Sequence, residues 1–198
     1  ATAKGLVKRA PLADFGNVRR TGIIALKLRT DDRLQWAKHS SGNDQIIIVT
    51  RAGQAIRFKE KDLRPMGRAA TGVTAIRLRK GDAVAGLDII NEAEIGPSKL
   101  RILSVMARGF AKQTPLKDYK VQRRGGSGLK TAKVTDKTGP VISANVVSDA
   151  TEEVLAFSSK GQALKTKLVN VRVAGRATQG VRIMNLESGD SLVGIVCL

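Results

Sequence analysis

Short apolar runs rich in β-branched residues alternate with glycine-containing turns along the whole chain. The run Ile46–Val49 followed by the turn Arg51–Gly53 is typical. Runs of this length and composition predict strands, not helices. In this stretch we expect two hairpins joined by a polar loop: strands 46–50 and 54–59, strands 72–78 and 83–90, and loop 60–71.

The pattern repeats. Residues 46–90 align without gaps on residues 154–198, with fourteen identical positions. A third copy lies between them, marked by Gly109 and Gly128, and an incomplete N-terminal copy begins without its first strand. Self-similarity at this period indicates copies of one supersecondary unit. The approximate repeats are 1–40, 41–94, 95–149 and 150–198.

Repeats of about 50 residues with four strands each are typical of a propeller, in which each sheet buries a face against its neighbours. We therefore expect residues 1–198 to form one all-β domain. Its predicted architecture is a propeller-like disc of about four blades, each a four-stranded antiparallel sheet.

The charge of the chain restricts the classes of partner that it is expected to bind. It has 35 Lys and Arg residues against 17 Asp and Glu, a formal net charge of +18, which attracts polyanions. Because 42% of the residues are hydrophobic and the cations are scattered, a folded basic domain is favoured over a disordered tail. Aromatic residues make up 3%, too few for a base-stacking groove. Duplex DNA held by its phosphates fits this composition better.

The loop between the predicted hairpins carries cations in every copy. Corresponding loops on successive blades should fall on one side of the disc, so these cations would form a periodic stripe. The candidate DNA-binding residues are Arg19, Arg20, Arg64, Arg68, Arg123, Arg124, Arg172 and Arg176, together with Lys130. Lys112, Lys117, Lys165, Lys167, Arg57 and Lys59 could extend the path, although any one of them could equally be a solvated surface cation.

The loop of the third copy has the most distinctive composition. Two adjacent guanidinium groups, Arg123 and Arg124, can each contact phosphate oxygens. The neighbouring glycines permit a tight loop whose N–H groups would lie close to the DNA backbone. Gln122 could orient the loop or bond a phosphate, and Ser127 can donate a hydrogen bond without adding charge. The full candidate loop is Gln122, Arg123, Arg124, Gly125, Gly126, Ser127 and Gly128.

This loop resembles the gyrase A box, a seven-residue signature of the C-terminal DNA-wrapping domain of bacterial DNA gyrase A. The resemblance covers nearly the whole chain. It includes the segments Ala3–Gly5, Pro11–Phe15, Arg64–Arg68 and Gly175–Val181. The chain departs from the family pattern in having Ser127 where Lys or Arg is usual, in carrying the box in the third copy, and in offering about four blades where six are common.

The resemblance implies a β-pinwheel whose blades exchange strands and whose basic rim wraps duplex DNA without sequence specificity. It also implies an accessory, non-catalytic role in DNA supercoiling, with the rest of gyrase A and with gyrase B as partners in an ATP-dependent type II topoisomerase. The expected location is the bacterial cytoplasm, with nucleoid association. The homologous domain of topoisomerase IV, and a propeller that serves as a protein or RNA interaction scaffold, remain open as alternatives.

Few residues suggest other chemistry. Cys197 lies in an apolar terminal run, and His39 lacks the neighbours that a zinc site requires. Tyr119 is expected to pack or to bond a phosphate, and Asp82 and Asp190 to serve in hairpin turns. No cofactor, metal site or catalytic residue is expected in this domain. The sequence also contains no apolar stretch of membrane-spanning length.

Overall fold

The computed structural model describes residues 1–18, 20–97 and 99–198, and within them the chain forms short strands, 3-10 helices and loops, which confirms the all-β class. The strands are β1 (Leu6–Val7), β2 (Gln45–Thr50), β3 (Gln54–Lys59), β4 (Val73–Thr74), β5 (Val84–Ile90), β6 (Arg101–Met106), β7 (Phe110–Pro115), β8 (Leu129–Lys130), β9 (Val141–Val147), β10 (Glu153–Ser158), β11 (Ala163–Lys167), β12 (Val181–Arg182) and β13 (Leu192–Cys197). The 3-10 helices are η1 (Leu12–Phe15), η2 (Glu60–Asp62), η3 (Glu92–Glu94), η4 (Leu116–Asp118) and η5 (Leu168–Asn170).

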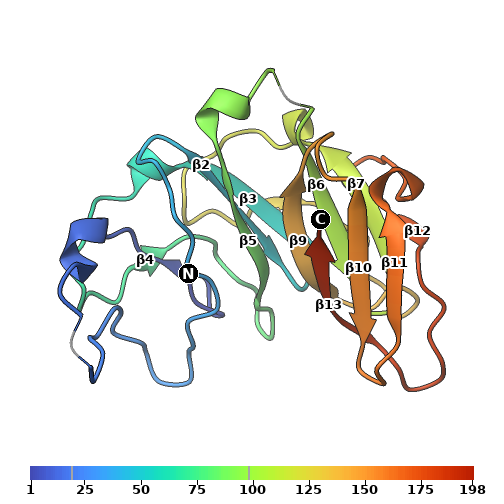
Figure 1. The fold of residues 1–198 in the computed structure, drawn as a ribbon, viewed down its shortest axis with the longest axis horizontal. Helices are drawn as coiled ribbons and strands as arrows, with labels where there is room; N and C mark the ends of the chain where they lie inside the picture. The colour runs from blue at the N-terminus through green and yellow to red at the C-terminus, as the bar shows by residue number, and fades with distance from the viewer. Residues whose placement is uncertain (19, 98) are drawn as a thin grey trace.

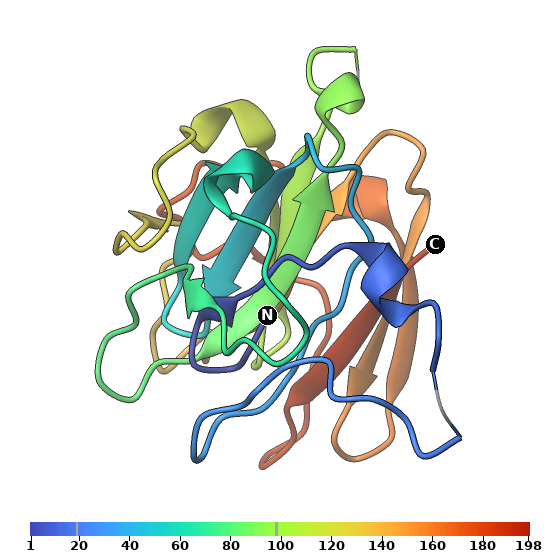
Figure 2. The same cartoon turned by 90° about the vertical axis from the view of Figure 1, so that its left-hand side faces the viewer.

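The strands form four antiparallel sheets that follow one another across the molecule in chain order (Figure 1). Two sheets are complete, in the orders β5-β2-β3-β8 and β9-β6-β7-β12. The first sheet pairs β1 with β4, and the last has the order β11-β10-β13. Figure 2 looks along this row from the N-terminal side. The repeat pattern predicted this series of blade-like sheets, and the family resemblance implied the pinwheel architecture.

Each complete sheet takes its outermost strand from the next repeat. Strand β8 belongs to the third repeat but pairs with β3 of the second, through Leu129 opposite Ala55. Strand β12 of the fourth repeat pairs with β7 of the third, through Val181 opposite Ala111. In the same way β4 joins β1. The repeats are therefore joined by strand exchange.

The exchange corrects one sequence prediction. The hairpin of strands 46–50 and 54–59 is confirmed as β2 and β3, but strands 72–78 and 83–90 do not form a second hairpin. Residues 73–74 pair with β1, whereas β5 pairs with β2. A sequence repeat identifies the strands of each copy, but it carries no information about which sheet each strand joins.

Glycines make the close approach at each exchange possible. Gly128 has φ of 74°, a left-handed conformation that favours glycine. A Cβ atom there would lie 2.5 Å from the carbonyl oxygen of Ala55, closer than any side chain allows. Gly53 approaches from the other side, and a Cβ atom on it would lie 2.7 Å from the carbonyl oxygen of Ala132. The recurring glycines of the repeat thus serve the joints between sheets as well as the turns.

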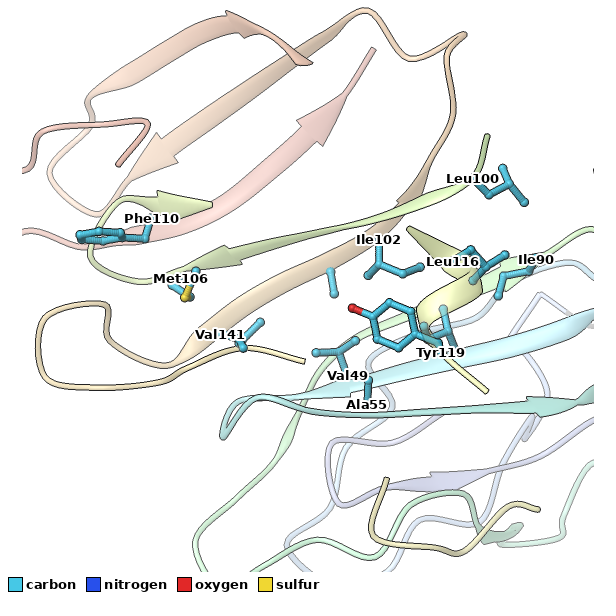
Figure 3. Close-up of a cluster of buried hydrophobic side chains, with 13 residues drawn as sticks. Val49, Ala55, Ile90, Leu100, Ile102, Met106, Phe110, Leu116, Tyr119 and Val141 are labelled. Carbon is cyan, nitrogen blue, oxygen red and sulfur yellow. The ribbon is translucent and has the colours of Figure 1, made fainter. Parts of the chain in front are cut away.

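The core lies between the sheets. All six residues of β2 are buried, and successive side chains of a strand point to opposite faces. Ile46 and Ile48 belong to the cluster shared with the first sheet, whereas Ile47 and Val49 belong to the cluster shared with the third sheet, where Ile102 is buried (Figure 3). A central sheet therefore buries both faces, which explains its continuous apolar run.

The two edges of the sheets have different surroundings. Strands β5, β9 and β13 lie at one edge and contact one another in sequence, and the backbone N–H of Val146 donates to Asp88 Oδ2 at 2.9 Å between β9 and β5. At the opposite edge lie the exchanged strands β8 and β12. We call this opposite edge the outer edge. The cationic loops lead directly into it.

Candidate nucleic-acid interface

Three loops of successive repeats occupy equivalent positions at the outer edge. We call residues 63–72, 119–128 and 171–180 the rim loops. Each connects a 3-10 helix to an exchanged strand. Each is also held to the preceding repeat by a backbone hydrogen bond from an equivalent residue: Met66 to Arg9 at 2.9 Å, Gln122 to Arg57 at 2.7 Å and Ala174 to Gln113 at 2.8 Å. The three loops therefore stand in the same relation to three successive sheets.

One position of the rim loops carries an exposed cation in every copy. Arg64 and Arg172 occupy it in the second and fourth repeats, and both are exposed. In the third repeat the equivalent residue is Lys120, which is also exposed and which the sequence reasoning did not single out. The constant spacing from the following glycine, eight residues in each copy, is the signal that could have found it.

A second position carries a half-buried arginine in every copy: Arg68, Arg124 and Arg176. Arg124 donates from Nε to the carbonyl oxygen of Asp62 at 3.2 Å and from Nη1 to that of Thr74 at 3.3 Å. Arg176 Nη1 donates in the same way to the carbonyl oxygen of Lys130 at 3.2 Å. Arg124 and Arg176 thus hold the rim loop of one repeat against the chain of the preceding repeat.

The two adjacent arginines of the third loop therefore differ. Arg123 is exposed, and among the described residues its guanidinium has no hydrogen-bond partner. Arg124 is partly engaged by backbone carbonyls. We expected both side chains to contact phosphate equally, but of the two only the Arg123 guanidinium makes no hydrogen bond to the described residues.

The glycines of this loop also act mainly within the protein. Gly125 has φ of 81°, and its N–H donates to the carbonyl oxygen of Ala75 at 2.6 Å. Gly126 accepts from the N–H of Arg77 at 2.8 Å. The expectation that these backbone N–H groups face DNA is therefore wrong for Gly125, whose donor is already used. The glycines instead let the loop fold onto the preceding repeat.

The remaining candidates have varied surroundings. The side-chain amide nitrogen of Gln122 is buried, and no hydrogen-bond partner for it is found within the described residues, so neither of its two expected roles is tested. Ser127, Lys130 and Arg20 are exposed. Arg19 lies outside the described residues. The additional cations Lys59, Lys117, Lys165 and Lys167 are exposed as well.

Two cations named as possible extensions of the DNA path are internal. Arg57 is buried, and its guanidinium donates to Gln45 Oε1 at 2.7 Å and to the carbonyl oxygens of Leu116 and Tyr119 at 3.1 and 3.0 Å. Lys112 is also fully buried. Neither can reach DNA, because the backbone of the following repeat covers both of them. Their residue types are usually exposed, so composition alone pointed the wrong way.

The other singled-out residues have structural surroundings. Tyr119 is buried between the second and third sheets (Figure 3), its hydroxyl lies 2.5 Å from Thr131 Oγ1, and burial raises its pKa. Of the two expected roles, the structure supports packing, because the hydroxyl is buried against Thr131. Asp82 Oδ1 accepts the N–H groups of Ala52 and Ala83 at 2.9 and 2.8 Å, so this aspartate ties two turns together. His39 is exposed.

Asp190 ties the corresponding turns of the fourth repeat. Its Oδ1 accepts from the Ser159 hydroxyl at 2.8 Å and from the N–H groups of Lys160 and Ser191 at 3.1 and 2.8 Å. These hydrogen bonds lower the pKa of Asp190 to about 2, against the effect of desolvation. In the described part of the chain, no cluster of three or more His, Cys, Asp or Glu residues is placed to hold a metal ion. Nor do its helices include one long and apolar enough to cross a membrane.

The known proteins that resemble this chain match nearly its whole length. The family described as DNA gyrase C-terminal domain, beta-propeller, matches residues 1–40, 44–91, 107–148 and 152–198. The DNA gyrase A protein of Lawsonia intracellularis is 44% identical over 194 residues, which cover 98% of this chain and 23% of that protein. The DNA gyrase A protein of Staphylococcus aureus is 39% identical over 196 residues, which cover 99% of this chain and 21% of that protein.

Solved structures agree with the fold. A DNA gyrase A C-terminal domain superposes with a TM-score of 0.86 at 26% identity, over 100% of this chain and 64% of that one. The C-terminal domain of DNA topoisomerase IV superposes with a TM-score of 0.91 at 20% identity, over 100% of this chain and 60% of that one, a likeness that concerns the fold alone. The chain spans between a fifth and a quarter of the length of the curated relatives it matches.

Proposed function

The chain belongs to the DNA gyrase C-terminal domain family, and from that premise we propose that it binds duplex DNA along its outer edge, bends it and so assists DNA supercoiling. In this proposal residues 1–198 act as one domain, with no catalysis of their own. ATP use and strand cleavage belong to other parts of a type IIA topoisomerase. The remainder of gyrase A, the gyrase B protein and the DNA of the bacterial cytoplasm are the proposed partners.

The row of rim loops carries the proposal. Arg64, Lys120 and Arg172 stand at one equivalent position of three successive repeats, and Arg123 adds a further exposed guanidinium in the middle loop. Such cations neutralise phosphates without reading bases, so binding should be tolerant of sequence. Exposed Lys130 in β8 and Arg182 in β12 extend the positive charge onto the exchanged strands.

The affinity gained from phosphate contacts is large enough to offset the free energy of bending a duplex. Smoothly bending a site of about 20 to 30 base pairs through about 40 to 90° costs roughly 1 to 6 kcal/mol. A protein that makes about 6 to 10 phosphate contacts loses roughly 10³ to 10⁵ in affinity between about 50 and 200 mM salt. Contacts of that number can therefore offset the bend at low ionic strength, and wrapping should fail before simple binding as salt is added.

We favour a gyrase domain over a topoisomerase IV domain for two reasons. The loop Gln122–Gly128 resembles the gyrase A box, and the two relatives above are both gyrase A proteins. An RNA or protein scaffold is the alternative of another class. It would exploit the same positive charge but would not change DNA topology. Competition between duplex DNA and RNA, measured across a salt titration, separates these two functions.

The test compares two triple variants that each remove three positive charges. The first neutralises the row, with Arg64→Ala, Arg123→Ala and Arg172→Ala. The matched control is Arg51→Ala, Lys80→Ala and Arg108→Ala, three exposed cations in turns outside the rim loops. We expect the row variant to lower the slope of log K against log salt by about 3, since each phosphate contact contributes about 0.9. We expect the control to change it by less than about 1.

Topology supplies the second measurement. Nicked circles sealed by ligase in the presence of the wild-type chain should show a shifted linking number at low salt, and the row variant should lose most of that shift. Unchanged linking numbers with the wild-type chain, or equal losses in the row and control variants, would reject the proposal.

A further inference from the structure

Lys112 lies at the base of the fourth-repeat rim loop, although it belongs to β7 of the third repeat. Its side chain is fully buried. Its ammonium donates to the carbonyl oxygens of Gly175, at 2.7 Å, and Arg176, and it contacts Thr178 Oγ1 at 3.3 Å. Three acceptors from one four-residue stretch therefore converge on a single cation. The loop is shaped around this ammonium group.

The same arrangement occurs at the first joint of the molecule, two repeats earlier in sequence. Lys8 of the first repeat stands three residues after Gly5, as Lys112 stands three residues after Gly109. Its ammonium donates to the carbonyl oxygens of Gly67 at 3.2 Å and Arg68 at 2.6 Å, the equivalents of the loop residues that Lys112 binds. Lys8 is half-buried and also donates to the carbonyl oxygen of Ala25 at 2.5 Å, so the two lysines share the contacts to the rim-loop carbonyls, whereas full burial is particular to Lys112.

The middle joint uses a different device. The position equivalent to Lys112 is Ile56, and a Cβ atom on Gly126 would lie 3.6 Å from its Cδ1. The loop there is held instead by the N–H of Gly125, at 2.6 Å from the carbonyl oxygen of Ala75. Arg124 bonds the preceding repeat at this joint as Arg176 does at the next one, so the arginine is common to both devices. Ala69 and Ala177 stand where Gly125 stands, and neither adopts a positive φ. The lysine therefore accompanies the loops that lack the glycine turn.

Burying an ammonium group is costly unless its donors are satisfied. For Lys112, burial and the nearby Arg176 guanidinium lower the pKa to about 8, while Asp118 acts in the opposite direction. Thr178, whose hydroxyl oxygen lies 3.3 Å from the ammonium nitrogen, carries no negative charge. A buried cation at this cost is better explained by the loop geometry that it imposes than by stability.

We propose that Lys112 and Lys8 are positioning residues for DNA wrapping: each shapes the rim loop of the next repeat from beneath and does not itself contact DNA. The inference rests on the function proposed above. It divides the cations of the chain into those that meet phosphate and those that hold the loops in place. Lys112 belongs to the second group although its residue type suggests the first.

The decisive variant is Lys112→Met, which keeps an unbranched side chain one heavy atom shorter and removes the ammonium group. We expect amide hydrogen exchange over residues 174–179 to become at least tenfold faster, with no change over residues 121–128. Wrapping should fall severalfold while the slope of log K against log salt stays within about 0.5 of wild type, since no phosphate contact is lost. Lys160→Met, at an exposed turn position, is the matched control.

The pH dependence of DNA wrapping distinguishes loss of the Lys112 charge from general destabilisation of the domain. Lysines that contact phosphate keep their charge up to about pH 9, so wild-type wrapping should weaken between pH 7 and 9 as Lys112 loses its proton. The profile of Lys112→Met should be flatter. Should this variant fail to fold, the wild-type profile and Thr178→Val, which removes one acceptor, still decide the question.

A fall of about 0.9 in the salt slope of Lys112→Met would mean that Lys112 meets phosphate directly, and would overturn the inference. Unchanged hydrogen exchange over residues 174–179 would also overturn it. If the wild-type chain does not wrap DNA at all, the proposed function fails, whereas the hydrogen-exchange result still tests the positioning of the loop. The two failures are therefore distinguishable.

Discussion

Gly128 lies against Ala55 so closely that a Cβ atom on Gly128 would stand 2.5 Å from the Ala55 carbonyl oxygen. The contact marks the point where the third repeat enters the sheet of the second. Gly180 lies against Ala111 in the same manner one repeat later. Both glycines have positive φ, of 74° and 77°. Strand exchange in this fold thus depends on residues without side chains.

Gly128→Ala should therefore destabilise the domain. The left-handed backbone costs a residue with a Cβ atom about 1 to 2 kcal/mol, and the contact with Ala55 adds to that cost, so we expect a loss of at least about 2 kcal/mol in the free energy of unfolding. Gly126→Ala is the control, because its φ is not positive and its nearest neighbour would be 3.6 Å away. Urea denaturation of both variants measures the difference. Equal stabilities would contradict the role assigned to Gly128.

Tyr119→Phe should weaken the interface between the second and third sheets without affecting DNA. The variant leaves Thr131 Oγ1 without its buried partner, at a cost of about 1 to 3 kcal/mol. Adding Thr131→Val should recover part of that loss, because the orphaned hydroxyl is then removed. Thermal unfolding measures the stability, and a salt titration with duplex DNA should match that of the wild-type chain. A changed salt slope would mean that Tyr119 does reach phosphate.

Arg123→Ala and Arg124→Ala should have different effects. Loss of the exposed Arg123 should lower the salt slope by about 0.9 and leave stability unchanged. Loss of Arg124 removes bonds to the Asp62 and Thr74 carbonyl oxygens, so it should cost about 1 kcal/mol of stability and loosen the loop. The double variant should reduce wrapping more than simple binding, because the other repeats still supply cations. Equal loss of wrapping and binding would argue against a special role for this loop.

Lys112 should give stability and wrapping opposite pH dependences. Its pKa is lowered from 10.5 to about 8 in the folded chain, so between about pH 8 and 10.5 the unfolded chain binds more protons. The contribution of Lys112 to the free energy of unfolding therefore increases with pH in this window. Below pH 8 the charge is present in both states and the cost of burying it applies in full. Wrapping should decrease between about pH 7 and 9, where the folded chain loses the charge of Lys112.

Denaturant titrations of the wild-type chain and Lys112→Met at pH 7, 8, 9 and 10 measure this effect. The wild-type chain should gain stability relative to the variant as the pH rises. Parallel curves would show that the pKa of Lys112 is not shifted by folding.

The sequence predicted β2, β3 and β5 well because their signals are local, whereas the expected strand 72–78 is a strand only at Val73–Thr74. The apolar run at Ile46–Val49 and the turn at Gly53 define β2 and β3 with little reference to the rest of the chain. The partner of β4 was not predictable from the hydrophobic pattern, since Val73 pairs with Val7, far away in sequence. Only the family resemblance anticipated exchange. The glycine that precedes each exchanged strand is its local signal.

The predictions for the cations were likewise correct where the signal is local and wrong where burial depends on another repeat. Exposed Arg64, Arg123 and Arg172 were identified from composition and repeat position. Arg57 and Lys112 were misplaced, because their burial depends on the backbone of the next repeat, which passes over them. The sequence contains a partial signal for the lysines. Lys8 and Lys112 stand at one repeat position in the first and third repeats, and Ile56 stands at that position in the second. A cation that alternates with an apolar residue at a single register position indicates an interior site.

The short strand β8 has a mechanical consequence. Arg123 is separated from Leu129 by only the glycine-rich turn, so the loop that would hold DNA continues directly into a strand hydrogen-bonded to the preceding sheet. A force on that guanidinium from a stiff, bent duplex would therefore be transmitted to the second sheet through β8 and to the third sheet through η4 and β7. The tension of the curved DNA would be spread across a seam, and no single blade would have to bear it alone.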